Sequence, residues 1–169
     1  MPDNKIPAAM ITAPGSGQGK SMDTAALARL HRNAGRNVRV FKHGPDYLDP
    51  MVLEVASGNP VYQLHPWMTG EAAQSADLIL VEGSMGLFDG SPSSGDLAKL
   101  AGIPALPVID AKGMAQTFGA VAMGLASFDS ELPVHQVIAN KIGSSYHGEL
   151  LRESLPDGIS LLGAIPRND

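Results

Sequence analysis

The chain has 169 residues, of which 44% are hydrophobic and 17% charged, so its composition indicates one globular domain rather than a disordered segment. A net charge of −5 argues against a broad basic surface, and we do not expect the protein to bind nucleic acid. It has no cysteine, which excludes disulfides, thiolate metal sites and a cysteine nucleophile from these residues. Neither a signal peptide nor a membrane span is predicted, so we expect a cytoplasmic protein.

The first predicted unit is a strand, a loop and a helix. Residues 6–12 (IPAAMIT) form a continuous apolar run, which is typical of a strand buried on both faces of a parallel sheet. A glycine-rich loop follows at 13–19. Helical spacing then places Met22, Ala26 and Leu30 on one face of a helix.

Strands and helices alternate along the rest of the chain. Pro107 lacks a ladder donor, so its strand is expected to be short or at an edge of the sheet. The alternation predicts a single doubly wound α/β domain over residues 1–169, with ligands at the carboxyl ends of its strands. Further strands are predicted at 38–42, 78–81, 105–109, 136–140 and 161–165, and further helices at 51–56, 114–127 and 147–154.

Residues 13–21 (APGSGQGKS) are the most informative segment, because they follow a strand and open a helix. Lys20 is predicted to reach the β- and γ-phosphates of a nucleotide, and the Ser21 hydroxyl to bind Mg²⁺. Pro14 stands where the usual pattern has a glycine. The alternative is a glycine-rich turn with a solvated lysine. The backbone N–H groups expected to surround the phosphates belong to Gly15, Ser16, Gly17, Gln18 and Gly19.

Acidic residues occur where the predicted strands end. Glu82 directly follows LILV, and we expect it to hold Mg²⁺ rather than to cap a turn. Of the two acids in GPDYLDP, we favour a functional role for Asp46 and a helix N-cap for Asp49. Asp110 either caps the next helix or takes part in the chemistry of the site. Lys42 either neutralises the phosphoryl group that is transferred or is an exposed lysine at the end of its strand. No metal-ligand spacing is present among His43, His65, His135 and His147, which are expected to be surface or packing residues.

Six segments together resemble the cobyrinic/hydrogenobyrinic acid a,c-diamide synthase family of cobalamin biosynthesis. GPDYLDP and EGSMGLFDG are the most specific. The segments are FKHGPDYLDP (41–50), VEGSMGLFDG (81–90), GDLAKLAGIP (95–104), VIDAKGMAQT (108–117), ANKIG (139–143) and LLGAIPR (161–167). The resemblance implies a P-loop fold of the dethiobiotin-synthetase-like type. It also implies a two-step ligase reaction, in which ATP phosphorylates a corrinoid carboxylate and ammonia then displaces phosphate to leave an amide.

The resemblance also implies roles for individual residues. It makes Ser21, Asp46 and Glu82 the metal ligands, with Lys20 and Lys42 supplying positive charge. Tyr47, Leu48 and Asp89 match positions that the family uses for substrate handling or for the intermediate. Asn140, in ANKIG, matches the asparagine expected to read adenine.

The chain departs from the family in length. Members normally continue into a glutamine-amidotransferase-like domain, whose cysteine nucleophile produces the ammonia. We expect that domain to be absent here. The chain would then be a fragment, which is the interpretation we favour, a domain served by a separate amidotransferase, or a relative that uses free ammonia. The segment at 67–77 is also shorter than usual. The alternative hypothesis is a non-catalytic or truncated module that binds ATP without amidating a substrate; a dethiobiotin-synthetase-like carboxylation ranks last. The sequence leaves open whether the chain forms a homodimer.

Overall fold

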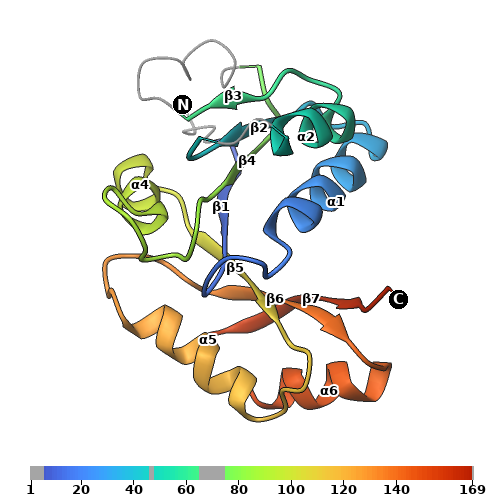
Figure 1. Ribbon diagram of the computed structural model, residues 1–169, viewed down its shortest axis with the longest axis vertical. Coiled ribbons are helices and arrows are strands. Elements are labelled where there is room, and N and C mark those ends of the chain that lie inside the picture. Colours follow the sequence, from blue (N-terminus) through green and yellow to red (C-terminus); the bar gives the residue numbers. More distant parts are fainter. Residues whose placement is uncertain (1–5, 46–47, 65–74, 169) are drawn as a thin grey trace, which may run out of the picture.

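Seven parallel strands form one sheet in the order β3-β2-β4-β1-β5-β6-β7 in the computed structural model, which describes residues 6–45, 48–64 and 75–168 (Figure 1). This arrangement confirms the predicted α/β fold class. The strands are β1 (Ala8–Thr12), β2 (Val38–Lys42), β3 (Tyr62–Gln63), β4 (Leu78–Glu82), β5 (Ala105–Asp110), β6 (Gln136–Ile142) and β7 (Ser160–Pro166). The helices are α1 (Lys20–Asn33), α2 (Asp49–Ser57), α4 (Ser94–Ala101), α5 (Thr117–Ser127) and α6 (Ser145–Glu153).

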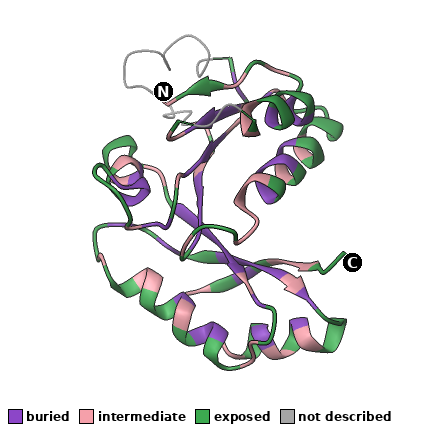
Figure 2. Ribbon diagram, in the orientation of Figure 1, coloured by how far each residue is buried: buried purple, intermediate pink, exposed green. Residues whose placement is uncertain are grey.

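Helices cover both faces of the sheet, with α1 and α2 on one side and α4 on the other (Figure 1). Successive side chains of a strand point to opposite faces. In β1, accordingly, Ile11 packs into the cluster under α1 and α2, whereas Met10 packs into the cluster under α4. Both side chains are fully buried, and the central strands are the most buried part of the fold (Figure 2). This burial explains their continuous apolar sequences.

Helix α1 buries a different face from the one its large apolar residues suggested. Met22 and Leu30 are 68% and 64% exposed, whereas Thr24, Ala25 and Ala28 are buried against the sheet. Small side chains let the helix axis approach the strands closely, so packing depends on size as well as hydrophobicity. The predicted helix is confirmed, but the stripe of Met22, Ala26 and Leu30 lies on its exposed side.

Pro107 lies in a central strand, and the prediction of a short or edge strand was wrong. The six residues of β5 pair with β1 on one side and β6 on the other. Pairing with β1 runs up to Pro107, and pairing with β6 begins at Val108. The proline therefore lies at the end of the pairing with β1 and just before the pairing with β6. Its missing N–H does not break a run of hydrogen bonds with either neighbour.

Two helices differ from the prediction. Helix α4 was not predicted; it begins with a capping box in which Ser93 and Asp96 exchange hydrogen bonds, and ends at Gly102 with a φ of 64°. Helix α5 begins at Thr117, three residues later than predicted, because the chain turns at 112–113 after β5.

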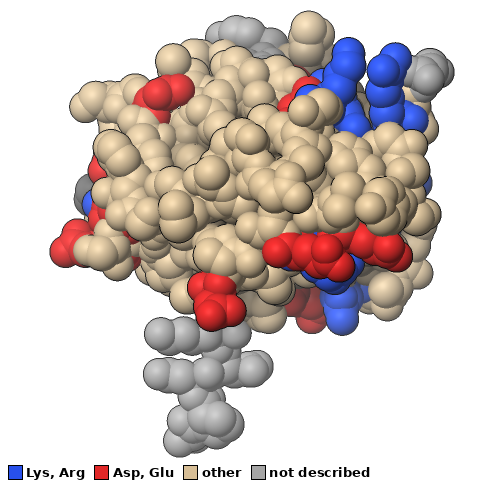
Figure 3. Space-filling model, turned by 90° about the horizontal axis from the view of Figure 1, so that it is seen from below, with Lys and Arg blue, Asp and Glu red and all other residues tan. Residues whose placement is uncertain are grey.

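Surface charge is sparse on the face seen from below in Figure 3, where acidic side chains lie in separate groups and the few basic ones form no continuous patch. Within the described ranges, no helix is both long enough and apolar enough to span a bilayer.

Candidate functional site

The predicted phosphate loop lies between the end of β1 and the first turn of α1. Its residues Ser16, Gly17, Gly19, Lys20 and Ser21 line a cleft of about 490 Å³ at the carboxyl edge of the sheet. The ring of the preceding proline is exposed and is not part of the cleft lining. Pro14 therefore does not block the cleft.

Gly19 is a position where only glycine fits. Its φ is 105°, and a Cβ atom there would lie 2.1 Å from Nδ2 of Asn140. That same Nδ2 donates to the carbonyl of Gln18 at 2.9 Å, and Oε1 of Gln18 accepts from the N–H of Asp110 at 2.8 Å. Gln18 thus connects the loop to β5 through its side chain and to β6 through its backbone carbonyl.

Lys20 reaches across the cleft to the loop that follows β4. Its Nζ donates to the carbonyl of Met85 at 2.6 Å and to that of Gly15 at 3.3 Å. Met85 has a φ of 54°, a backbone conformation that non-glycine residues seldom adopt. Burial lowers the pKa of Lys20; Lys42 acts in the same direction, while Glu82 opposes the shift. The ammonium is held by carbonyl dipoles that a phosphate can replace.

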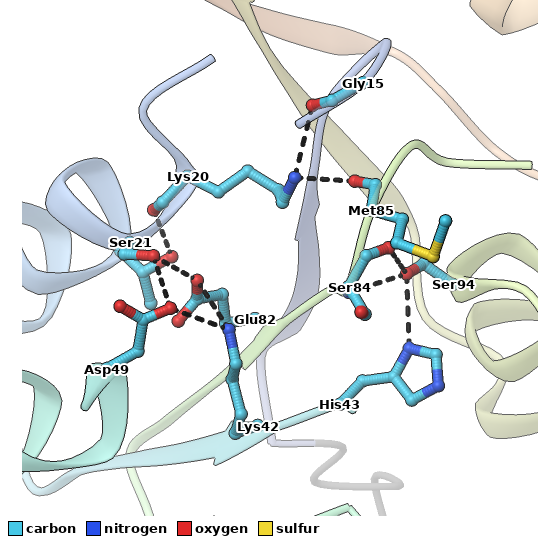
Figure 4. Close-up of polar contacts among 11 residues, drawn as sticks. Gly15, Lys20, Ser21, Lys42, His43, Asp49, Glu82, Ser84, Met85 and Ser94 are labelled. Carbon is cyan, nitrogen blue, oxygen red and sulfur yellow. Dashed lines mark hydrogen bonds and ion pairs between the residues drawn. The ribbon is translucent and has the colours of Figure 1, made fainter. Parts of the chain in front are cut away.

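Four side chains from different elements meet beside Lys20, as Figure 4 shows. Glu82 at the end of β4 accepts from the Ser21 hydroxyl at 2.6 Å and pairs with Nζ of Lys42 at 3.0 Å. Asp49 at the start of α2 lies 2.8 Å from the same hydroxyl and 3.0 Å from the same ammonium. The hydroxyl has one hydrogen and can donate to only one carboxylate at a time.

The cluster is buried and charged. Lys42 and Glu82 are 5% and 1% exposed. Burial works against the charge on Lys42, but the carboxylates of Glu82 and Asp49 outweigh it and raise the pKa of the ammonium. Burial raises the pKa of Glu82, opposed by Ser21 and Lys42. Oε2 of Glu82 is buried without a hydrogen-bond partner among the described residues.

These oxygens suit a hard divalent cation. Mg²⁺ prefers oxygen ligands and keeps several waters or phosphate oxygens, so one hydroxyl and one or two carboxylates are sufficient protein ligands. Ser21 offers the hydroxyl, and the unpartnered oxygen of Glu82 offers a carboxylate donor. Among the residues that the structure describes, no three His, Cys, Asp or Glu side chains form a metal site by themselves.

Asp49 corrects one prediction. It is the first residue of α2 rather than its N-cap, which is Leu48 in a helical conformation. The carboxylate faces Ser21 and Lys42 because the chain turns after β2 and brings the start of α2 over the phosphate loop. Asp46 and Tyr47 lie outside the described residues.

Asp89 and Asp110 lie outside the cleft lining. Asp89 accepts from the N–H of Gly86 at 3.0 Å and so closes its own loop. Asp110 accepts from the N–H of Lys112 at 3.0 Å and pairs with Lys141 at 2.6 Å, a turn and an ion pair rather than a helix cap.

His43 was predicted to be a surface or packing residue, but it lines the cleft next to Lys42. Its Nδ1 lies 3.3 Å from the hydroxyl of Ser94, which donates to the carbonyl of Ser84 at 3.1 Å. Burial and the charge of Lys42 lower the pKa of His43, which favours the neutral ring. Ser94 comes from α4, and no sequence motif pointed to it.

Comparison with known proteins identifies the family of this fold and site. Residues 9–169 match the model of the CobQ/CobB/MinD/ParA nucleotide binding domain, CbiA. The chain belongs to this family. The chain is 59% identical to the hydrogenobyrinate a,c-diamide synthase of Stutzerimonas stutzeri over 99% of its length, and 44% identical to the cobyrinate a,c-diamide synthase of Herminiimonas arsenicoxydans over 98%. It spans 41% and 40% of these two relatives, about two-fifths of their length.

Two solved structures show that other proteins share the fold. The cell division protein FtsY of Thermotoga maritima superposes with a TM-score of 0.66 at 17% identity, covering 99% of this chain and 64% of FtsY. The signal recognition particle 54 kDa protein of Aeropyrum pernix, solved in complex with GDP, gives 0.64 at 19% identity, covering 98% of this chain and 43% of that protein. These likenesses place the family domain in the P-loop fold.

Proposed function

We propose that this chain is the ATP- and Mg²⁺-dependent synthase domain that amidates the a and c side-chain carboxylates of cobyrinic or hydrogenobyrinic acid. One observation carries the proposal: Lys20, Ser21, Lys42 and Glu82 meet in one cleft beside the EGSMGLFDG loop. The diamide synthase relatives support the substrate class.

The reaction needs two steps. A carboxylate oxygen of the corrinoid attacks the γ-phosphorus of ATP, which releases ADP and leaves an acyl phosphate. Ammonia then attacks the acyl carbon, phosphate departs, and a proton is lost from nitrogen to leave the carboxamide. Since both reactants of the first step are anions, catalysis depends on positioning and positive charge.

Residues of this chain supply both requirements. The backbone of 15–19 and the N-terminus of α1 would surround the phosphates, and Lys20 would leave the Met85 carbonyl for the β- and γ-oxygens. Lys42, held by Glu82 and Asp49, would face the incoming carboxylate. Ser21 and Glu82, together with Asp46, would hold Mg²⁺, which neutralises phosphate charge when bound.

The remaining assignments concern the nucleoside and the ammonia. Asn140 would contact the adenine from the end of β6. Tyr47 and Asp89 would handle the substrate or the intermediate. Ammonia would come from a glutamine amidotransferase domain outside these residues, and a cytoplasmic location follows from such a biosynthetic role.

The test is amidation of hydrogenobyrinic acid by this chain with MgATP and an ammonium salt, followed by mass spectrometry. We expect one and then two amides, and no product from Lys20→Ala, which removes the charge partner of the phosphates. Tight MgATP binding without any amide, at high ammonium concentration, would instead favour a non-catalytic nucleotide-binding module.

A further inference from the structure

A second cavity lies on the other side of the first turn of α1. It measures about 610 Å³, and Gly19 and Met22 line both it and the phosphate cleft. Asn140 and Arg167 contribute a side-chain amide and a positive charge to its wall. The two cavities therefore adjoin at the beginning of α1, one on each side of Gly19.

Asp23 is the acidic residue in the wall of this cavity. It is 4% exposed, and its Oδ2 has no hydrogen-bond partner among the described residues. Lys141 also lines the cavity, but its ammonium pairs with Asp110 at 2.6 Å. A buried carboxyl oxygen without a partner is unfavourable in the empty protein, and it is relieved only when a donor arrives.

The position of Asp23 indicates which donor that is. If Lys20 and Ser21 hold the terminal phosphates, the nucleoside of the same molecule has to extend past Gly19 along the first turn of α1. A Cβ atom on Gly19 would be 3.9 Å from Oδ2 of Asp23, so the carboxyl group adjoins the path of the nucleotide. Nucleosides carry donors, the exocyclic amine of the base and the ribose hydroxyls, whereas phosphates carry none at neutral pH.

We propose that Asp23 accepts a hydrogen bond from the nucleoside of the bound nucleotide and is a specificity-determining residue of the site. The proposal rests on the proposed function, because it needs a nucleotide in the phosphate cleft. It adds a second recognition group to Asn140, which lines the same cavity and also lies close to Gly19.

The experiment compares nucleotides that lack one donor each. Dissociation constants are measured by isothermal titration for ATP, for purine riboside triphosphate, which has no 6-amino group, and for 2′-deoxy- and 3′-deoxy-ATP. We expect the wild-type chain to bind ATP about tenfold or more tightly than one of these analogues, since a hydrogen bond to a charged group has that effect. The affected analogue identifies the base amine or the ribose hydroxyl as the donor.

The variants Asp23→Leu and Asp23→Ala both remove the acceptor, the first with a larger side chain than aspartate and the second with a smaller one. In both variants we expect the dissociation constant of that analogue, divided by the dissociation constant of ATP, to fall to about one. The ratio cancels any general change in affinity caused by removing a negative charge near the phosphates. Asp157→Asn, at an exposed loop position, is the charge-matched control and should keep the wild-type ratio.

Three results overturn the inference. If wild type binds all four nucleotides equally, or if either folded variant keeps the wild-type ratio, Asp23 does not read the nucleoside. If the folded wild-type chain binds none of the nucleotides, the proposed function fails and this inference with it. Circular dichroism of each variant shows which of them are folded.

Discussion

At the scale of single residues, the most deeply buried positive charge described at the site is the ammonium of Lys42. This side chain is buried between Glu82 and Asp49, each 3.0 Å away. Burying an ion is costly unless a partner of opposite charge compensates, and removal of one partner leaves the other uncompensated. The pair therefore fixes the edge where β2, β4 and α2 meet, and the same fixed charge faces the cleft.

Replacing Lys42 tests how strongly this edge depends on the pair. We expect Lys42→Met to lower the free energy of unfolding by about 3–5 kcal/mol, because it leaves the Glu82 carboxylate buried without the ammonium. The double variant Lys42→Met/Glu82→Gln should recover part of the loss. Urea unfolding measures both. Lys99→Met is the control, since Lys99 pairs with Asp129 at the surface and its loss should be much smaller. Equal losses of stability in Lys42→Met and Lys99→Met would show that the buried pair stabilises the fold no more than the surface pair does.

Asp23 gives the chain a pH-dependent stability. Burial raises the pKa of Asp23 from 3.8 to about 6, so the folded state favours the protonated acid. Because the folded state binds this proton more tightly than the unfolded state, protonation of Asp23 contributes to the free energy of unfolding. That contribution is complete below about pH 4 and is lost as the pH rises through 6. Asp23→Asn has no charge to bury, and we expect it to exceed wild type by roughly 2–3 kcal/mol at pH 8 and to match it near pH 4. Urea unfolding between these pH values, without nucleotide or Mg²⁺, tests this; a difference independent of pH would contradict it.

At the scale of elements, α5 packs closely against the end of α6 at Gly119. A Cβ atom on Gly119 would lie 1.9 Å from the carbonyl oxygen of Ser154, a backbone atom that cannot rotate away. In the same helix, a Cβ atom on Gly124 would have no neighbour within 4 Å. In α5, therefore, the packing requires a glycine at Gly119 but not at Gly124.

Alanine substitutions separate these two glycines. Gly119→Ala should destabilise the protein by about 1–3 kcal/mol or more, because two helices must move apart. Gly124→Ala should stabilise it by about 0.5–1 kcal/mol, because alanine loses less backbone entropy in a helix. Thermal unfolding of the two variants measures the contrast, and a stable Gly119→Ala variant would show that α5 and α6 are not packed this closely.

At the scale of the whole molecule, the site is a consequence of the parallel sheet. The neighbouring strands β1, β4 and β2 end at one edge, and they bring Ser21, Glu82 and Lys42 together, although Ser21 and Glu82 are 61 residues apart in the chain. A ligand in the cleft then contacts several strands and helices at once. Nucleotide binding should therefore stabilise the entire fold rather than one loop.

A thermal shift measures this coupling. At a MgATP concentration of 100 times the dissociation constant, the gain is about 2.7 kcal/mol. For a chain of this size, that gain corresponds to a rise in Tm of roughly 5–10 °C. Lys20→Ala should show no such rise, and adenosine, which lacks the phosphates, should give little in wild type. A full shift in Lys20→Ala would mean that the phosphates bind elsewhere.

Local sequence signals determined much of this protein. Strand-length apolar runs and the glycine-rich loop predicted the α/β order and most of the elements, because burial on both faces of a sheet and the backbone conformation of a tight loop restrict the residues that can stand there. They also predicted that Lys20, Ser21 and Glu82 would meet, since loops and strand ends share one edge in this topology.

Only the tertiary structure decided which residues face one another. In the folded chain Met22 and Leu30 of α1 face outward, and Pro107 lies in a central strand. Asp49 joins the charged cluster, and a buried oxygen of Asp23 lies at the second cavity. Each of these depends on the size and charge of partners far away in the chain, which a local pattern does not contain.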